Sequence, residues 1–90
     1  ADLHYIPVAP HNVSSPLGMM AACHLCAAIP NFLALEFHGR QVPWWEGMAR
    51  GDKPFIRSGT MTVADRPGIG VELDDAEARK LLWDGDTYFD

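Results

Sequence analysis

The sequence predicts an α/β fold in which this chain is one part of a larger barrel or parallel sheet. An apolar run at residues 4–9, a helix-forming stretch from residue 16 and a second apolar run at residues 32–37 follow one another in the order of a βαβ unit. Two parallel strands and one helix cannot cover both faces of their own sheet, and residues 40–90 supply no further units of this kind. We therefore expect the rest of the sheet to come from a lost segment or from another chain.

The first predicted strand, at residues 4–9, ends just before His11. Pro7 lies inside this run, although proline removes a ladder hydrogen-bond donor and is usually found at an edge or a bulge. A polar, turn-prone loop follows His11 and leads into a helix. A titratable side chain at the tip of a strand, just before a helix, is where α/β proteins place their chemistry. His11 is therefore a candidate functional residue, and the alternative is a histidine that only ends the strand.

The helix is predicted to run from Pro16 to Ala28 or Ile29. Ser15 is a favourable N-cap residue, and proline is well tolerated at the first helical position. Pro30 should end the helix, because proline disfavours the helical conformation of the residue before it. Both faces of the helix are small or apolar, so we expect it to be buried on most sides.

The second predicted strand, at residues 32–37, is apolar except for Glu36. Such a continuous run is typical of parallel strands that are covered on both faces. Four short elements are expected after it: a helix at 42–49, strands at 60–63 and 71–73, and a helix at 74–82. Asp74 and Glu77 are spaced as a capping box at the start of the last helix. The stretch 67–70, between the two short strands, is expected to be a turn.

Composition narrows the classes of partner and setting. The formal net charge is −5 and the seven Lys and Arg residues are scattered, so we expect neither nucleic acid nor an anionic membrane as a partner. No apolar stretch reaches the roughly 20 residues of a membrane span, and the N-terminus lacks the features of a signal peptide. Two cysteines are too few for a disulfide framework, and a cytoplasmic setting fits best. The missing initiator Met suggests that the chain was processed or truncated.

His11 and Glu36 form the main candidate site. They are 25 residues apart, one βα repeat, so both are expected at the carboxyl ends of neighbouring parallel strands, which is the catalytic end of barrels and open sheets. The imidazole suits a general base. Burial of Glu36 among apolar neighbours is expected to raise its pKa, so that the neutral carboxyl group could donate a hydrogen bond to an oxyanion. The alternative role for Glu36 is to pair with an arginine or lysine elsewhere in the fold.

The other histidines and the two cysteines give weaker signals. His38 lies two residues beyond Glu36 and could project toward the same site, or it could lie just past the strand in solvent. His24 lies in the middle of the helix and is expected to be a hydrogen-bonded core histidine. Cys23 and Cys26 match the C-x-x-C pattern of redox and zinc sites, but they lie well inside the helix and no second pair exists to complete a zinc site. Small, buried apolar side chains are the better account of both cysteines.

Four stretches of the sequence together resemble the C-terminal part of the mandelate racemase and sugar-acid dehydratase branch of the enolase superfamily. They are Ala9-Pro10-His11-Asn12, the helix 20–28, Ile29-Pro30-Asn31-Phe32 with Leu35-Glu36, and Pro67-Gly68-Ile69-Gly70-Val71-Glu72-Leu73. They span nearly all of the chain in the family's order and spacing. Each stretch alone would be a weak match, whereas the combination is specific.

The resemblance implies a (β/α)7β TIM-like barrel, of which residues 1–50 would form the last βα units. Residues 51–90 would then be a C-terminal tail that packs on an N-terminal capping domain absent from this chain. The remaining N-terminal part of the same protein is thus an expected partner, and we also expect a homo-oligomer.

The resemblance also implies a reaction. His11 would be the base that removes the proton α to a carboxylate, and Glu36 would stabilise the resulting enolate by hydrogen bonding. Asn12 and His38 are candidates for contacts with substrate. The enolate would be held by Mg²⁺. The ligands of this metal, and the aspartate that orients the histidine, would lie on earlier strands that are absent from this chain, so no metal ligand is expected in this segment. The 90-residue chain alone is therefore expected to be inactive.

Within this branch, the stretches around His11 and Glu36 look most like those of gluconate, galactonate and arabinonate dehydratases. We therefore expect elimination of the β-hydroxyl group of a sugar acid, which gives a 2-keto-3-deoxy sugar acid. The alternatives are a racemase or epimerase of a 2-hydroxy acid on the same barrel, and a non-catalytic barrel homologue that serves binding or assembly.

Overall fold

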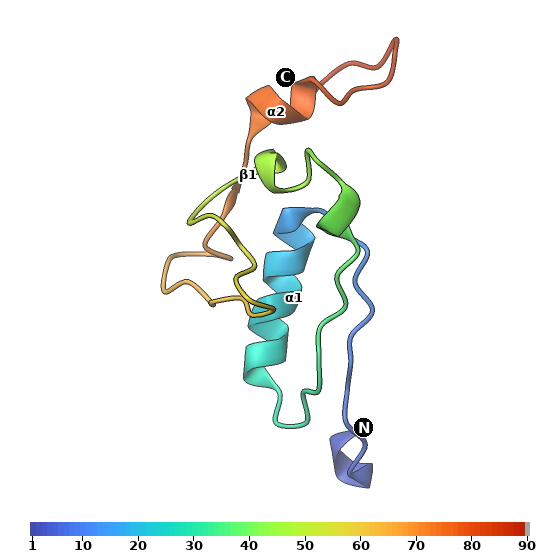
Figure 1. Cartoon of the computed structure of the whole chain (residues 1–90), viewed down its shortest axis with the longest axis vertical. Coiled ribbons are helices and arrows are strands. Elements are labelled where there is room, and N and C mark those ends of the chain that lie inside the picture. Colours follow the sequence, from blue (N-terminus) through green and yellow to red (C-terminus); the bar gives the residue numbers. More distant parts are fainter. Residues whose placement is uncertain (90) are drawn as a thin grey trace.

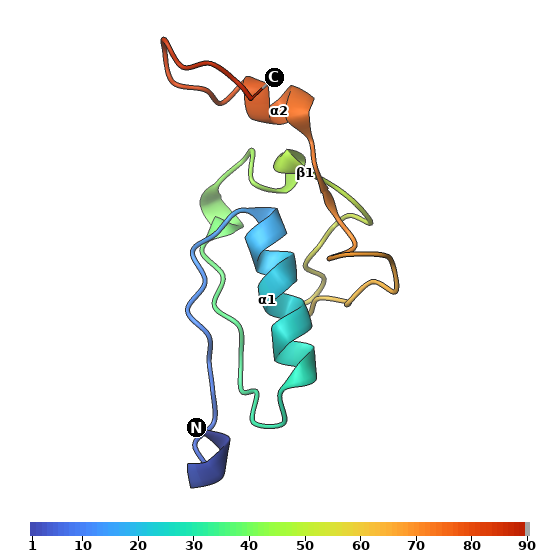
Figure 2. The same ribbon diagram turned by 180° about the vertical axis from the view of Figure 1, so that it is seen from behind.

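The computed structural model describes residues 1–89 of the chain. One long helix lies beside two extended segments, and the loops of residues 50–71 lie on its other side (Figures 1 and 2). Residues 74–89 extend beyond the N-terminal end of that helix (Figures 1 and 2). The molecule is elongated, with principal extents of 49 × 26 × 26 Å. Its elements in chain order are the 3-10 helix η1 (Asp2–His4), α1 (Pro16–Ala28), the 3-10 helices η2 (Gly39–Gln41) and η3 (Glu46–Met48), β1 (Ala49–Arg50), β2 (Glu72–Leu73) and α2 (Asp75–Arg79).

Helix α1 begins and ends where the sequence predicts. The Ser15 side chain accepts a hydrogen bond from a backbone N–H of the first turn, and Pro16 occupies that turn. The backbone becomes extended at Ile29, directly before Pro30. One face of the helix is buried, through Met19, Met20, Cys23 and Cys26. Burial on most sides is not found within this chain, because Leu25 on another face is exposed.

One extended segment precedes α1 in the sequence and the other follows it, and the two run parallel to each other in space. A parallel bridge joins Val8 and Phe32. The Val8 N–H donates to the Asn31 C=O at 2.8 Å, and the Leu33 N–H donates to the Val8 C=O at 2.9 Å. The order of extended segment, helix and parallel extended segment agrees with the predicted βαβ unit.

Continuous strands at residues 4–9 and 32–37 are not formed, which corrects the prediction from sequence. The first residues instead coil into η1, after which Tyr5 adopts a left-handed conformation with φ of 56°. Pro7 and Pro10 have no N–H group, so neither residue can add a donor to the ladder. The pairing is therefore reduced to a few hydrogen bonds between extended backbones.

Strands β1 and β2 form a short antiparallel pair in the second half of the chain. Ala49 pairs with Leu73, and Arg50 pairs with Glu72. The predicted strand at 71–73 is confirmed in part, since β2 covers two of its residues. Its partner is β1 and not the predicted strand at 60–63, because pairing partners far apart in the sequence leave no local signal.

Two other predictions for the second half are wrong. Residues 42–49 do not form an α-helix, because backbone hydrogen bonds between residues three apart produce turns and η3 before the chain enters β1. Residues 60–63 do not form a strand. Ser58 and Gly59 both have positive φ, of 49° and 78°, and fold the chain into a tight turn immediately before that stretch.

Helix α2 is shorter than the helix predicted at 74–82. Its predicted N-cap is confirmed, since the Asp74 carboxylate accepts a hydrogen bond from the Glu77 N–H at 3.2 Å. The Asp74 N–H donates to the Met48 C=O at 2.8 Å rather than to the Glu77 side chain, so the capping box is not closed. The turn expected at 67–70 is confirmed by a backbone hydrogen bond of 3.4 Å between its last and first residues.

The core is centred on Trp45, which is 7% exposed. Its ring meets Phe37 and Phe55 edge to face, with centroids 5.0 Å and 6.4 Å apart. Its indole N–H donates to the Ser14 C=O at 2.9 Å, which ties the loop before α1 to the segment before η3. The remaining buried members of the core are Met19, Met20, Cys23 and Ala49.

Much apolar surface lies outside this core. Large side chains are exposed along the chain, among them Leu3, Leu33, Trp83 and Phe89. Among residues 1–89, no helix has the length and apolar character needed to cross a membrane. Exposed apolar surface of this kind is typical of a face that packs against another part of a protein.

Candidate active site

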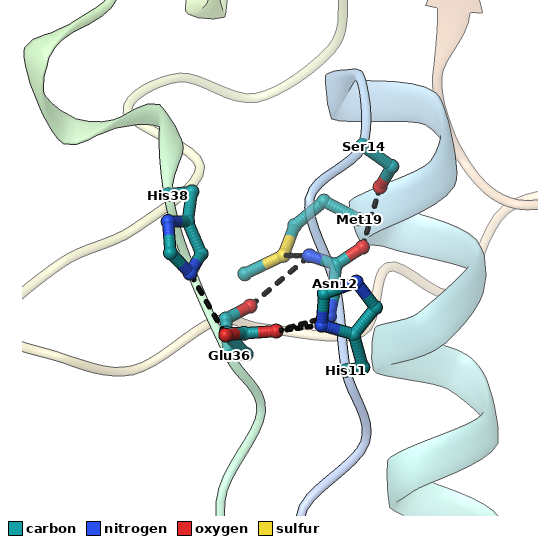
Figure 3. A network of polar contacts seen from close by, with 6 residues as sticks. All are labelled: His11, Asn12, Ser14, Met19, Glu36 and His38. Carbon is teal, nitrogen blue, oxygen red and sulfur yellow. Dashed lines mark hydrogen bonds and ion pairs between the residues drawn. The ribbon is translucent and has the colours of Figure 1, made fainter.

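The candidate site lies where the two extended segments end side by side. The Glu36 N–H donates to the Pro10 C=O at 3.3 Å, which continues the parallel pairing and brings Glu36 beside His11. Figure 3 shows the Glu36 carboxylate between the rings of His11 and His38, with α1 beside them. The proximity that the 25-residue spacing predicted is therefore present in the structure.

The Glu36 carboxylate contacts three nitrogen atoms. Its Oε2 lies 2.6 Å from His11 Nδ1 and accepts a hydrogen bond of 2.8 Å from the Asn12 N–H. Its Oε1 lies 2.8 Å from His38 Nε2 (Figure 3). One carboxylate thus joins two imidazoles that come from different segments of the chain.

The pKa of Glu36 lies below its usual value, which corrects the expectation of a raised pKa. The hydrogen bond from the Asn12 backbone is the largest cause, followed by the one from His38, and the charges of His11 and His38 act in the same direction. Desolvation acts in the opposite direction and is weaker than either hydrogen bond, and 37% of the Glu36 side chain is exposed. The apolar residues that precede Glu36 in sequence therefore do not decide its protonation state.

The two histidines differ in their exposure and in the ring nitrogen that faces Glu36. The His11 side chain is 82% exposed and that of His38 is 58% exposed. Nδ1 of His11 faces the carboxylate, so Nε2, on the far side of the ring, is the nitrogen left for a ligand. His38 directs Nε2 toward Glu36, so its side chain contacts the carboxylate while remaining exposed to solvent.

Asn12 lies behind the carboxylate and is 7% exposed. Its side-chain amide donates to the Glu36 C=O at 3.1 Å and to the Met19 sulfur, and it accepts a hydrogen bond from the Ser14 hydroxyl (Figure 3). Sequence reasoning missed Ser14 and Met19. The Asn-x-Ser spacing of the loop is a sequence signal for such local side-chain hydrogen bonds. No sequence signal pointed to the contact of Met19 with Asn12.

His24 and the two cysteines take structural positions. His24 Nε2 lies 3.2 Å from the Ile69 C=O, which is the hydrogen-bonded role expected for it. Cys23 and Cys26 are free and buried, and burial raises the pKa of both thiols. A raised pKa lowers the fraction of reactive thiolate, so the structure favours a packing role over the redox alternative.

The described residues do not fit a magnesium site. Within residues 1–89 no group of three or more His, Cys, Asp or Glu side chains is arranged to hold a metal ion. Mg²⁺ prefers an octahedron of oxygen ligands, whereas both oxygens of Glu36 already contact nitrogen atoms.

Comparison with known proteins places these features in a family. The sequence model of the family described as enolase C-terminal domain-like matches residues 1–78. Over all 90 residues the chain is 48% identical to a D-xylonate dehydratase of Haloferax volcanii, of which it covers 22%. It is 33% identical over 82 residues to a D-mannonate dehydratase of Caulobacter vibrioides, an alignment that covers 89% of this chain and 20% of that protein.

A solved structure agrees with these relatives. The crystal structure of a mandelate racemase/muconate lactonizing enzyme-like protein from Rubrobacter xylanophilus matches with a TM-score of 0.91 and 46% identity, covering 99% of this chain and 23% of that one. The chain therefore spans less than a quarter of the length of these relatives. The resemblance noted from the sequence is confirmed. The chain belongs to the enolase C-terminal domain-like family, and its fold is a part of that family's TIM-type barrel.

Proposed function

We propose that this chain is part of a longer polypeptide that acts as a sugar-acid dehydratase. Three observations support the proposal: relatives that carry the name dehydratase, the parallel unit of extended segment, helix and extended segment, and the 2.6 Å contact between His11 and Glu36. That contact carries the proposal, because an imidazole beside a carboxylate at the ends of adjacent segments suits a general base and its partner, at the end where such barrels perform their chemistry.

In the proposed reaction His11 takes the proton from the carbon α to the substrate carboxylate. The electrons of the broken C–H bond form an enolate, and they then expel the β-hydroxyl group, which leaves as water after it takes the proton that His11 removed. The resulting enol converts to a 2-keto-3-deoxy sugar acid. Glu36, which contacts Nδ1 of His11, would orient the imidazole ring so that Nε2 is the atom that takes the proton.

This assignment differs from the role that the sequence suggested for Glu36. A neutral carboxyl group that donates a hydrogen bond to the enolate requires a raised pKa, and the pKa of Glu36 is lowered. We propose instead that Glu36 acts as an ionised partner of His11. Any Mg²⁺ would be held by oxygen ligands outside this chain, and the capping domain of the longer polypeptide would be packed against residues 51–90.

The test uses two single variants of the complete polypeptide, His11→Asn and Glu36→Gln. Loss of a general base typically lowers the rate about 10²- to 10⁴-fold, so we expect His11→Asn to abolish exchange of the α-proton with deuterium and formation of the keto acid. His4→Asn is the matched control, since His4 is an exposed histidine in η1. Exchange at the parent rate in a folded His11→Asn variant would refute the role of His11.

A racemase or epimerase is the second candidate, favoured by the structural match to the mandelate racemase/muconate lactonizing enzyme-like protein of Rubrobacter xylanophilus. Both reactions begin with removal of an α-proton, so exchange alone does not separate them. Analysis of the product does. A keto acid with loss of water supports the dehydratase, an epimer of the substrate supports the racemase, and neither product from any sugar acid supports a non-catalytic homologue.

A further inference from the structure

The Glu36 carboxylate is held from two opposite sides by groups other than His11. The Asn12 N–H donates to Oε2 at 2.8 Å, and His38 Nε2 lies 2.8 Å from Oε1. A carboxylate with a separate donor on each oxygen cannot rotate without breaking one of the two interactions. Its Oε2 is thereby kept at the position from which it contacts His11.

Asn12 also fixes the backbone that carries Glu36. Its amide bridges the Glu36 C=O, at 3.1 Å, and the sulfur of Met19 in α1, while Ser14 donates to its carbonyl oxygen. These contacts use both ends of a side chain that is 7% exposed. A buried amide whose donor and acceptor are both engaged within the protein is poorly placed to bind a substrate, and it is well placed to hold a neighbour.

We propose that Asn12 and His38 are positioning residues, which clamp the Glu36 carboxylate against His11 from the backbone side and from the solvent side respectively. This inference rests on the proposed function, because the clamp has a chemical consequence only if His11 acts as the base. It replaces the contacts with substrate that the sequence suggested for both residues.

The charges around Glu36 define how the clamp should act. His11 faces the carboxylate from the first extended segment, and His38 faces it from two residues after Glu36 in the second segment. Helix α1 contributes the uncharged Met19, through its contact with Asn12. Removing the His38 ring should therefore raise the pKa of Glu36, since one hydrogen bond and one charge that lower it are lost. Asn12→Asp should raise it as well, because a second carboxylate would lie beside the first.

The first experiment measures kcat and KM of the complete polypeptide with His38→Ala and His38→Gln. Misplacement of a reacting group by about 1 Å can cost about 100-fold in rate, so we expect His38→Ala to lower kcat about 10- to 100-fold with KM little changed. His38→Gln keeps a donor and should recover part of kcat. A rise in KM at unchanged kcat would identify His38 as a substrate contact and overturn the inference.

The second experiment follows the carboxylate itself, by infrared difference spectra between each variant and the same variant with Glu36→Gln. We expect the Glu36 carboxylate to protonate at higher pH in His38→Ala and in Asn12→Asp than in the parent. Asn31→Asp is the matched control, because the Asn31 amide also joins the two segments, by donating to the Ile6 C=O at 2.8 Å, but lies at their other end.

The outcomes separate the inference from the proposed function. If His11→Asn leaves exchange intact, the proposed function fails. If His11→Asn abolishes exchange while His38→Ala and Asn12→Asp match Asn31→Asp in kcat and in Glu36 titration, the function stands and the clamp is refuted. Should Asn12→Asp not fold, the two His38 variants decide the result.

Discussion

Glu36 keeps its charge because its carboxylate meets N–H groups rather than the apolar side chains around it in the sequence. Its pKa is lowered, so the folded state favours the ionised form. The associated stabilisation is fully present above the pKa of the unfolded chain, about 4.3, and is lost as the pH falls through the lower folded pKa. The direction of a side chain and its hydrogen-bond partners decide such a shift, and neither can be read from the sequence.

The pH dependence of stability tests this sign. We expect the urea midpoint of the complete polypeptide to exceed that of Glu36→Gln most clearly above pH ~4.3, with the difference shrinking at lower pH. Glu72→Gln is the control, because Glu72 pairs with Arg50 in solvent at 3.5 Å and such pairs contribute little. A Glu36→Gln difference that grows as the pH falls would contradict the lowered pKa.

At the scale of elements, local signals were predictive and distant ones were not. Helix α1 was predicted at both ends because Ser15, Pro16 and Pro30 act on their immediate neighbours. Strand β1 was missed because Ala49 pairs with Leu73, a contact that no nearby residue announces. The two extended segments lie where the sequence predicted strands and run in the predicted parallel direction. They do not form continuous strands, because prolines in the first segment interrupt the ladder.

Trp45 connects several of these elements, so replacing it should lower the stability of the whole chain. We expect Trp45→Phe to lower the free energy of unfolding by about 1 kcal/mol or more, because the Ser14 C=O loses its hydrogen bond from the indole N–H. Trp44→Phe is a matched control, since Trp44 is adjacent but 48% exposed. Chemical denaturation of the complete polypeptide measures both, and equal effects would show that the Trp45 bond is unimportant.

At the scale of the whole molecule, the chain leaves apolar surface uncovered. Leu33 is 66% exposed although it lies in the middle of a paired segment. We expect the isolated 90-residue chain to bind an apolar fluorescent dye, and the complete polypeptide to bind far less per chain. A monomeric isolated chain that unfolds cooperatively and binds no dye would contradict this expectation. The need for a larger barrel was predictable, because two strands and a helix cannot cover their own faces.

The position of the carboxylate clamp has a consequence for how the family can diversify. His11, Asn12, Glu36 and His38 all lie in residues 11–38, and their mutual contacts are made within that stretch. The loops that follow contact it through the Trp45 bond to Ser14, the His24 contact with the Ile69 C=O and the packing of the core. We therefore expect a chimera that exchanges residues 11–38 between related barrels as one unit to keep these contacts, and one that recombines within the stretch to lose them.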